Sequence, residues 1–168
     1  MSHGVFRSDL MSGTDVAAEL VSVKYMGNDG NTATEIDNGC VVALDGLMEG
    51  EREIWKGVTP QANTPISDIA IIGTPEVLYD ERKKNLDEFY NEKNKPARGY
   101  LPHTRNIFSV TIDALNASGT PEVGDAVELM AGVKLNVVKE ATSGATQIGK
   151  IIAVEQAGRY TYFVIKIN

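Results

Sequence analysis

Few stretches of this chain carry residue types that could do chemistry, and the sharpest is the run from 144 to 150. Its sequence, Gly-Ala-Thr-Gln-Ile-Gly-Lys, fits the first seven positions of a phosphate-binding loop. The eighth position should be Ser or Thr to hold Mg²⁺, but it is Ile151. Such a loop also lies between a strand and a helix, whereas the residues after Lys150 are typical of a strand. We therefore expect these glycines to turn a hairpin, not to bind a nucleotide.

Three carboxylates, Glu49, Glu51 and Glu53, recur at every second position. On a strand they would share one face, spaced about 7 Å apart. Paired carboxylates at such separations can hydrolyse glycosidic bonds, but the reaction also needs a cleft and one carboxyl with a raised pKa. The sequence indicates neither, so a solvated face is the favoured interpretation and a hydrolase is the last of our hypotheses.

Candidate metal ligands and nucleophiles are sparse. His3, His103 and Cys40 have no metal-ligand spacing to one another. The run from Asn28 to Asn31 resembles part of a calcium loop, but the acidic residues needed downstream are missing, so a turn is expected. Cys40 opens an apolar stretch and is expected to be buried and unreactive. We predict no catalytic residue, no metal site and no cofactor, and hence a protein that is not an enzyme.

Four aromatic residues could instead form a binding face for sugars. They are Trp55, Tyr100, Tyr160 and Tyr162. Packing in the core and within sheets is the favoured alternative for all four.

Composition limits the class of protein. At 168 residues the chain is long enough for one domain or two small ones. The net charge is -7 and no basic block exists to neutralise a phosphate backbone, which makes nucleic acid a poor partner. No apolar run approaches the ~18 residues that span a bilayer, so no membrane contact is expected. The first residues have no basic and apolar signal regions, and the expected location is a cytoplasm or an assembly made there.

The pattern of the chain favours strands. Runs rich in β-branched or aromatic residues, bounded by turn residues, predict strands at 19–26, 40–44, 51–58, 67–73, 107–112, 126–130, 148–154 and 160–167. One helical segment is predicted from Pro75, after a Thr74 cap, to about Glu92. Its apolar stripe would consist of Val77, Leu78, Leu86, Phe89 and Tyr90.

The predicted fold is therefore mainly β. We expect small β-barrel or β-sandwich modules of a β-tulip-like kind, with an extended N-terminal arm and one short helical segment. Residues 1–16 form the arm, residues 17–115 a β-rich domain with a charged helical insertion near 75–95, and residues 116–168 a C-terminal β-module or a continuation of the same domain. The arm carries Val5, Phe6, Leu10 and Met11, which it could bury on its own domain or on a neighbouring subunit.

The order of these features resembles the head proteins of tailed bacteriophages that decorate or cement the capsid. The stretches that carry the resemblance are Asp-Asn-Gly-Cys-Val-Val-Ala-Leu at 37–44, Glu-Gly-Glu-Arg-Glu-Ile-Trp-Lys-Gly-Val-Thr-Pro at 49–60, and Arg-Gly-Tyr at 98–100 ahead of Ile-Phe-Ser-Val-Thr-Ile at 107–112. The C-terminal runs at 123–129, 149–155 and 162–167 are similar to the β-modules of such proteins. The resemblance covers nearly the whole chain and is structural, not catalytic.

The resemblance implies a structural role on the outer surface of a virion. The chain would stabilise an expanded capsid, assembled in the host bacterial cytoplasm, by bridging subunits of the major capsid protein. It would associate with itself, as a homotrimer. The arm would reach the capsid or a neighbouring protomer by strand addition through Val5, Phe6, Arg7, Leu10 and Met11. The alternatives are another virion part, such as a head-fibre base or a tail-tube subunit, and a carbohydrate-binding module.

Overall fold

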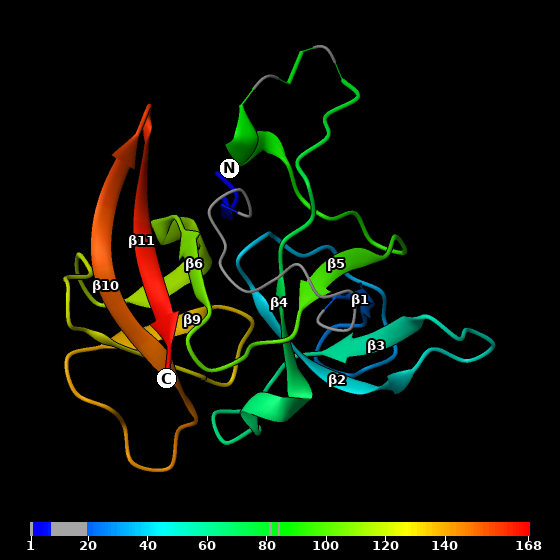
Figure 1. Cartoon of the computed structure of the whole chain (residues 1–168). Coiled ribbons are helices and arrows are strands. Elements are labelled where there is room, and N and C mark those ends of the chain that lie inside the picture. Colours follow the sequence, from blue (N-terminus) through cyan, green and yellow to red (C-terminus); the bar gives the residue numbers. More distant parts are fainter. Residues whose placement is uncertain (1, 8–19, 81, 84) are drawn as a thin grey trace.

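The computed structural model of the chain describes residues 2–7, 20–80, 82–83 and 85–168, and within them the fold consists of two β-sheets (Figure 1). The first sheet contains β1 (Leu20–Tyr25), β2 (Val41–Leu47), β3 (Ile54–Val58), β4 (Ile69–Ile72) and β5 (Ala97–Tyr100). The second contains β6 (Ile107–Val110), β7 (Leu115–Ala117), β8 (Ala126–Glu128), β9 (Leu135–Val138), β10 (Gln147–Ala157) and β11 (Tyr160–Ile167). Short 3₁₀ turns are η2 (Ile66–Asp68), η3 (Leu86–Glu88) and η4 (Ile112–Ala114).

The first sheet closes into a barrel in the order β1-β3-β2-β4-β5. All neighbours are antiparallel except β1 and β3, and β5 closes the barrel by pairing with β1. The second sheet has the order β6-β11-β10-β8-β9-β7, in which only β7 and β9 are parallel. The N-terminal segment runs along the outer edge of β6, where Phe6 bridges to Val110.

The core shows why β4 is apolar without interruption. Ile69 and Ile71 point to a cluster that also contains Phe108 and Val127 of the second sheet, so this cluster lies between the two sheets. Successive side chains of a strand point to opposite faces, and Ala70 and Ile72 accordingly lie in the smaller cluster inside the barrel. A strand that is buried on both faces has to be apolar at every position.

One glycine lets the barrel and the second sheet approach closely. Gly39 has a φ of +80°, and a Cβ there would meet Ala114 Cβ at 2.7 Å and Val110 Cγ1 at 2.9 Å. Its N–H donates to the carbonyl of Ile72 at 2.7 Å. Any larger residue would therefore separate η4 and β6 from the turn that leads into β2.

The predicted mainly β fold with a small barrel module is confirmed. Each of the eight predicted strands contains or overlaps an observed one, and β11 matches its prediction residue for residue. Three short strands, β5, β7 and β9, were not predicted. The chain passes from the first sheet to the second between Tyr100 and Ile107, so β6 and β7 share a sheet with the C-terminal strands.

The predicted helix from Pro75 to Glu92 is wrong in extent. The described residues there are irregular apart from η3, a single 3₁₀ turn. The physical reason is the spacing of the apolar stripe, because no apolar residue lies between Tyr79 and Leu86. A helix with such a gap has no continuous face to bury, and packing of that face supplies most of the stability of a helix in a protein.

Candidate interaction surface

The N-terminal segment is largely part of the core. Val5 and Phe6 are 1% and 3% exposed, and the Phe6 ring stacks on Tyr100 and Phe108 with centroids 5.8 and 5.9 Å away. Both side chains are thus buried on the chain's own strands, which removes them from the set of exposed groups that could contact a capsid or a second protomer. The Arg7 guanidinium lies over the Tyr162 ring, 5.3 Å from its centroid. The other two proposed contact residues, Leu10 and Met11, lie outside the described residues.

The motif at 144–150 has no phosphate-loop geometry. Gly144 lies in a turn with a φ of +85°, and Gln147 already begins β10, which carries Lys150 within a strand. A side chain on Gly149 would collide with the backbone carbonyl of Lys166, so this glycine is required by the close approach of β11. The expectation of a hairpin turn is wrong, because β9 and β10, which this turn joins, both pair with β8 and not with each other.

The other residues singled out for their chemistry remain apart. Glu49, Glu51 and Glu53 are exposed, as expected, but they lie in the turn between β2 and β3 and not on one face of a strand. Cys40 is 2% exposed, and burial, followed by the charge of Asp37, raises the pKa of its thiol from 9.0 to about 12. Within the described ranges no three His, Cys, Asp or Glu side chains are placed to hold a metal ion.

The four aromatic residues do not form a common face. Tyr100 and Tyr162 are 7% and 3% exposed, whereas Trp55 and Tyr160 are partly buried on different sheets. The alternative of packing in the core is therefore confirmed for Tyr100 and Tyr162.

Three of the eight exposed large apolar side chains among the described residues lie on residues 73–90. We call these residues, of which all but 81 and 84 are described, the projecting segment. It connects β4 to β5 and extends away from both sheets at the top of Figure 1, beside the tip of the β10–β11 hairpin. Tyr79 is 94% exposed, Val77 56% and Leu86 40%. An apolar group so exposed does not stabilise the fold of the chain, and clusters of such groups are typical of contact sites.

Two buried asparagines hold the base of the projecting segment. Asn38, which is fully buried, donates from Nδ2 to the Thr74 carbonyl at 2.7 Å and accepts from the Thr74 N–H at 3.0 Å. Asn91 donates from Nδ2 to Asn38 Oδ1 and to the Ile36 carbonyl, each at 3.0 Å. The two ends of the segment are thereby joined through one side chain.

A further contact, which involves no asparagine, joins Asp87 of the segment to the tip of the β10–β11 hairpin. The Asp87 carboxylate accepts from Arg159 Nη2 at 2.9 Å and from the Tyr160 hydroxyl at 2.8 Å. Burial, and then the hydrogen bond to Asp87, raises the pKa of Tyr160. The Asp87 carbonyl also accepts from the His3 N–H at 3.1 Å, and the His3 ring stacks on Tyr90. The segment is therefore held at Thr74, near its start, and at Asp87, near its end.

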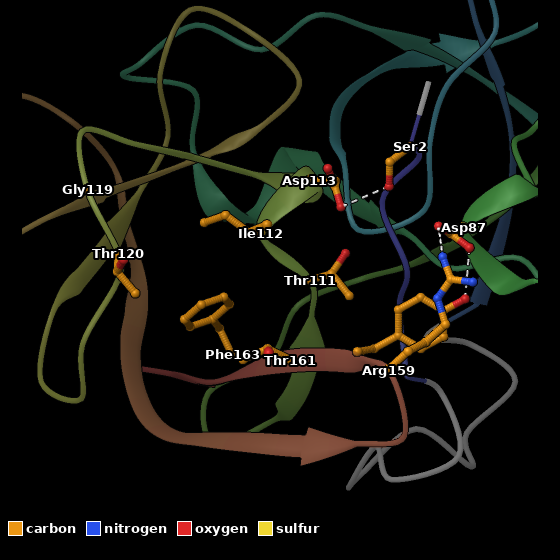
Figure 2. A pocket seen from close by; sticks show the side chains of 11 residues that line it. Ser2, Asp87, Thr111, Ile112, Asp113, Gly119, Thr120, Arg159, Thr161 and Phe163 are labelled. Atoms are coloured by element: carbon orange, nitrogen blue, oxygen red, sulfur yellow. Dashed lines mark hydrogen bonds and ion pairs between the residues drawn. The ribbon is translucent and has the colours of Figure 1, made fainter.

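A groove of about 670 Å³ opens beside this contact (Figure 2). Ile112, Thr120 and Phe163 surround its open space, and the pair of Asp87 and Arg159 lies at the opposite end. The groove has no histidine and no cysteine, and its Thr111 hydroxyl accepts from the Val5 N–H at 3.1 Å. Two of its hydroxyls donate to carboxylates, that of Ser2 to Asp113 Oδ2 at 3.3 Å and that of Tyr160 to Asp87 Oδ1 at 2.8 Å.

Comparison with protein-family models, with curated proteins and with solved structures finds no match to this chain. Among the described residues, no helix is long and apolar enough to cross a membrane.

The residues that shape this surface were not found from the sequence. Asn38 lies in the stretch 37–44, and Asp87 and Asn91 lie in the predicted helix, but no local pattern marks any of them as a contact. The sequence does contain one signal of an exposed apolar surface. Val77, Leu78 and Leu86 are apolar, although their segment has no continuous face on which to bury them.

Proposed function

We propose that this chain is a structural virion protein that decorates and stabilises the outside of an expanded tailed-phage capsid by bridging subunits of the major capsid protein. The observation that carries the proposal is Tyr79, 94% exposed with Val77 on a segment that Asn38 and Asp87 hold in place. An exposed tyrosine provides a large contact area at a low cost in conformational entropy, because its side chain has only two rotatable angles.

Further support comes from the resemblance of the sequence to decoration proteins and from the nature of the molecule. It is acidic and rich in β-structure. Packaged DNA presses a capsid outward, and a protein that binds only the expanded shell stabilises that state by mass action. Several weak contacts made at once by neighbouring copies, as in the predicted homotrimer, would strengthen the binding further.

In this proposal the projecting segment replaces Val5 and Phe6 as the contact region, because those two side chains are buried. Arg7, Leu10 and Met11 keep their place in the earlier hypothesis of a capsid-binding arm.

The test uses DNA-filled heads that lack the protein, heated with and without it. The intact chain should raise the temperature at which the heads release DNA, and Tyr79→Ser should lose most of that effect. Tyr79→Phe is the matched control, since it keeps the ring and should retain most of the effect. An unchanged release temperature with the intact chain would contradict the proposal.

A further inference from the structure

Strand β10 is longer than the strands beside it, and its last part has a neighbour on one side only. It pairs with β11 from Gly149 to Ala157 but with β8 only from Gln147 to Lys150. Backbone bonds between Ile151 and the 124–125 turn extend that contact by one residue. In the part of the chain that the structure describes, no strand pairs with the other edge of residues 152–157, and Figure 1 shows the hairpin extending beyond the rest of its sheet.

The hairpin geometry identifies the backbone groups at this free edge. Ala157 and Tyr160 close a two-residue turn whose first residue, Gly158, has a φ of +59°, as a type II′ turn requires. The closing pair of such a hairpin exchanges both hydrogen bonds, and bonded and non-bonded pairs then alternate along the strands. The N–H and C=O groups of Val154 and Gln156 accordingly point away from β11, toward the free edge.

The side chains beside this edge are apolar on the face that carries the groove. Val154 is 45% exposed and lies directly across from Phe163, which lines the groove together with Ile112, itself 45% exposed. Directly opposed residues on paired strands share a face, so the apolar surface continues from the groove to the edge. A free strand edge with apolar flanks is a template for another strand.

We propose that residues 152–157 bind an extended segment of a partner protein by β-strand addition, and that this segment alternates apolar and polar residues and carries Lys or Arg. The apolar side chains would contact Val154 and the groove. The basic residues match the exposed carboxylate of Glu155 and the half-buried carboxylate of Asp113, which accepts from the Ser2 hydroxyl at 3.3 Å. The nearby Arg159 is paired with Asp87 at 2.9 Å. Main-chain hydrogen bonds supply affinity in this mode, and alternate side chains supply specificity.

A second copy of this chain fits the edge less well. Antiparallel pairing of two identical edges confined to residues 152–157 places the two-fold axis near Val154 and Glu155. The two Glu155 carboxylates would then lie close together, and like charges across a strand pair are destabilising. Each chain also carries a net charge of -7.

The test is a titration of the full chain with the peptide acetyl-Lys-Thr-Val-Thr-Val-Thr-Lys-amide, followed by amide NMR. We expect the amide signals of Val154 and Gln156 to shift and to gain protection from hydrogen exchange. Val154→Pro removes one free N–H without touching the ladder to β11, a position where edge strands tolerate proline. It should weaken binding about tenfold or more, and clearly more than Val154→Thr, which keeps the N–H and loses only part of the apolar contact.

Two further measurements make the result decisive. Val154→Lys keeps the backbone N–H and should weaken binding of the lysine peptide by charge repulsion. This variant keeps the proposal testable if Val154→Pro fails to fold. A twin peptide with Glu in place of Lys should bind more weakly than the lysine peptide. No binding of the lysine peptide, equal binding to all variants, or a dimer of the intact chain that Val154→Pro dissociates would overturn the proposal. No phage heads are involved, so the outcome is independent of the proposed capsid function.

Discussion

Asn91 and Asn38 are joined side chain to side chain, with Asn91 Nδ2 donating to Asn38 Oδ1 at 3.0 Å, and both residues are buried. The same Asn38 amide binds both backbone groups of Thr74. A projecting segment that enters at Thr74 and leaves at Asn91 is therefore fixed at its base by one hydrogen-bond network. The network thus holds both ends of the segment that carries exposed apolar residues such as Tyr79.

Replacement of Asn38 by Ala should release the projecting segment. It leaves the N–H and carbonyl of Thr74 and the Asn91 amide without this partner, and we expect the free energy of unfolding to fall by about 2 kcal/mol or more. Urea denaturation measures the loss, and amide exchange should quicken from 74 to 91. Asn116→Ala is the control, because Asn116 makes one exposed bond to Asn136 and should cost under about 0.5 kcal/mol. Unchanged exchange in the segment would refute this role.

Replacement of Phe6 by Ala tests whether the N-terminal segment belongs to the core. Phe6 stacks on both Tyr100 and Phe108, so truncation should lower the free energy of unfolding by about 3–5 kcal/mol. Phe6→Leu, which keeps most of the apolar volume, should cost clearly less. A loss below 1 kcal/mol for Phe6→Ala, measured by denaturant titration, would place the segment outside the cooperative unit.

Glu128 should make stability depend on acid pH. It is 1% exposed; burial alone would raise the pKa of its carboxyl, but hydrogen bonds from Thr142, Gln147 and Asn136 together hold the pKa below the ordinary 4.5. The stabilisation that the ionised Glu128 carboxylate contributes to the fold is therefore present above pH 4.5. It is lost as the pH falls through the lower pKa of the folded state.

Replacement of Glu128 by Gln provides the matched measurement. The amide of Gln would direct an NH₂ group at a donor, and we expect the free energy of unfolding to fall by about 1–3 kcal/mol at pH 7. Urea titrations at a series of pH values from neutral into the acid range should show that the difference in free energy of unfolding between the two proteins becomes smaller. Curves that stay parallel over that range would contradict the assignment.

Cys40 should be inert in the folded protein. Its pKa of about 12 keeps the thiol protonated, so a thiol reagent at pH 8 should react only as fast as the protein unfolds. As the pH rises above 9, the unfolded chain loses this proton and the folded chain keeps it, so stability should fall. Cys40→Ala should lack this part of the alkaline loss, and rapid labelling of the folded protein would disprove the buried thiol.

The sequence predicted the strands that have their own pattern. Residues 160–167 are rich in β-branched and aromatic residues and follow Gly158, so β11 could be located from local signals. By contrast, β7 and β9 are three and four residues long and form a parallel pair between distant parts of the chain, which local propensity cannot encode. The helix was wrongly predicted because charged helix formers at 80–85 outweighed the missing apolar face.

The interaction surface was less predictable than the fold. Asparagine favours turns whether it is exposed or buried, so nothing local distinguishes Asn38, which organises the projecting segment, from Asn31, which lies in an exposed turn on Asp29. The burial of Val5 and Phe6 likewise depends on β6, which lies about a hundred residues away in sequence.

The most direct measurement of the capsid role is co-sedimentation of the purified chain with expanded, empty heads that lack it, with unexpanded heads as the control. We predict saturable binding to the expanded heads alone, with a plateau that gives the copy number. Absence of binding to either kind of head, or equal binding to both, would contradict a decoration function.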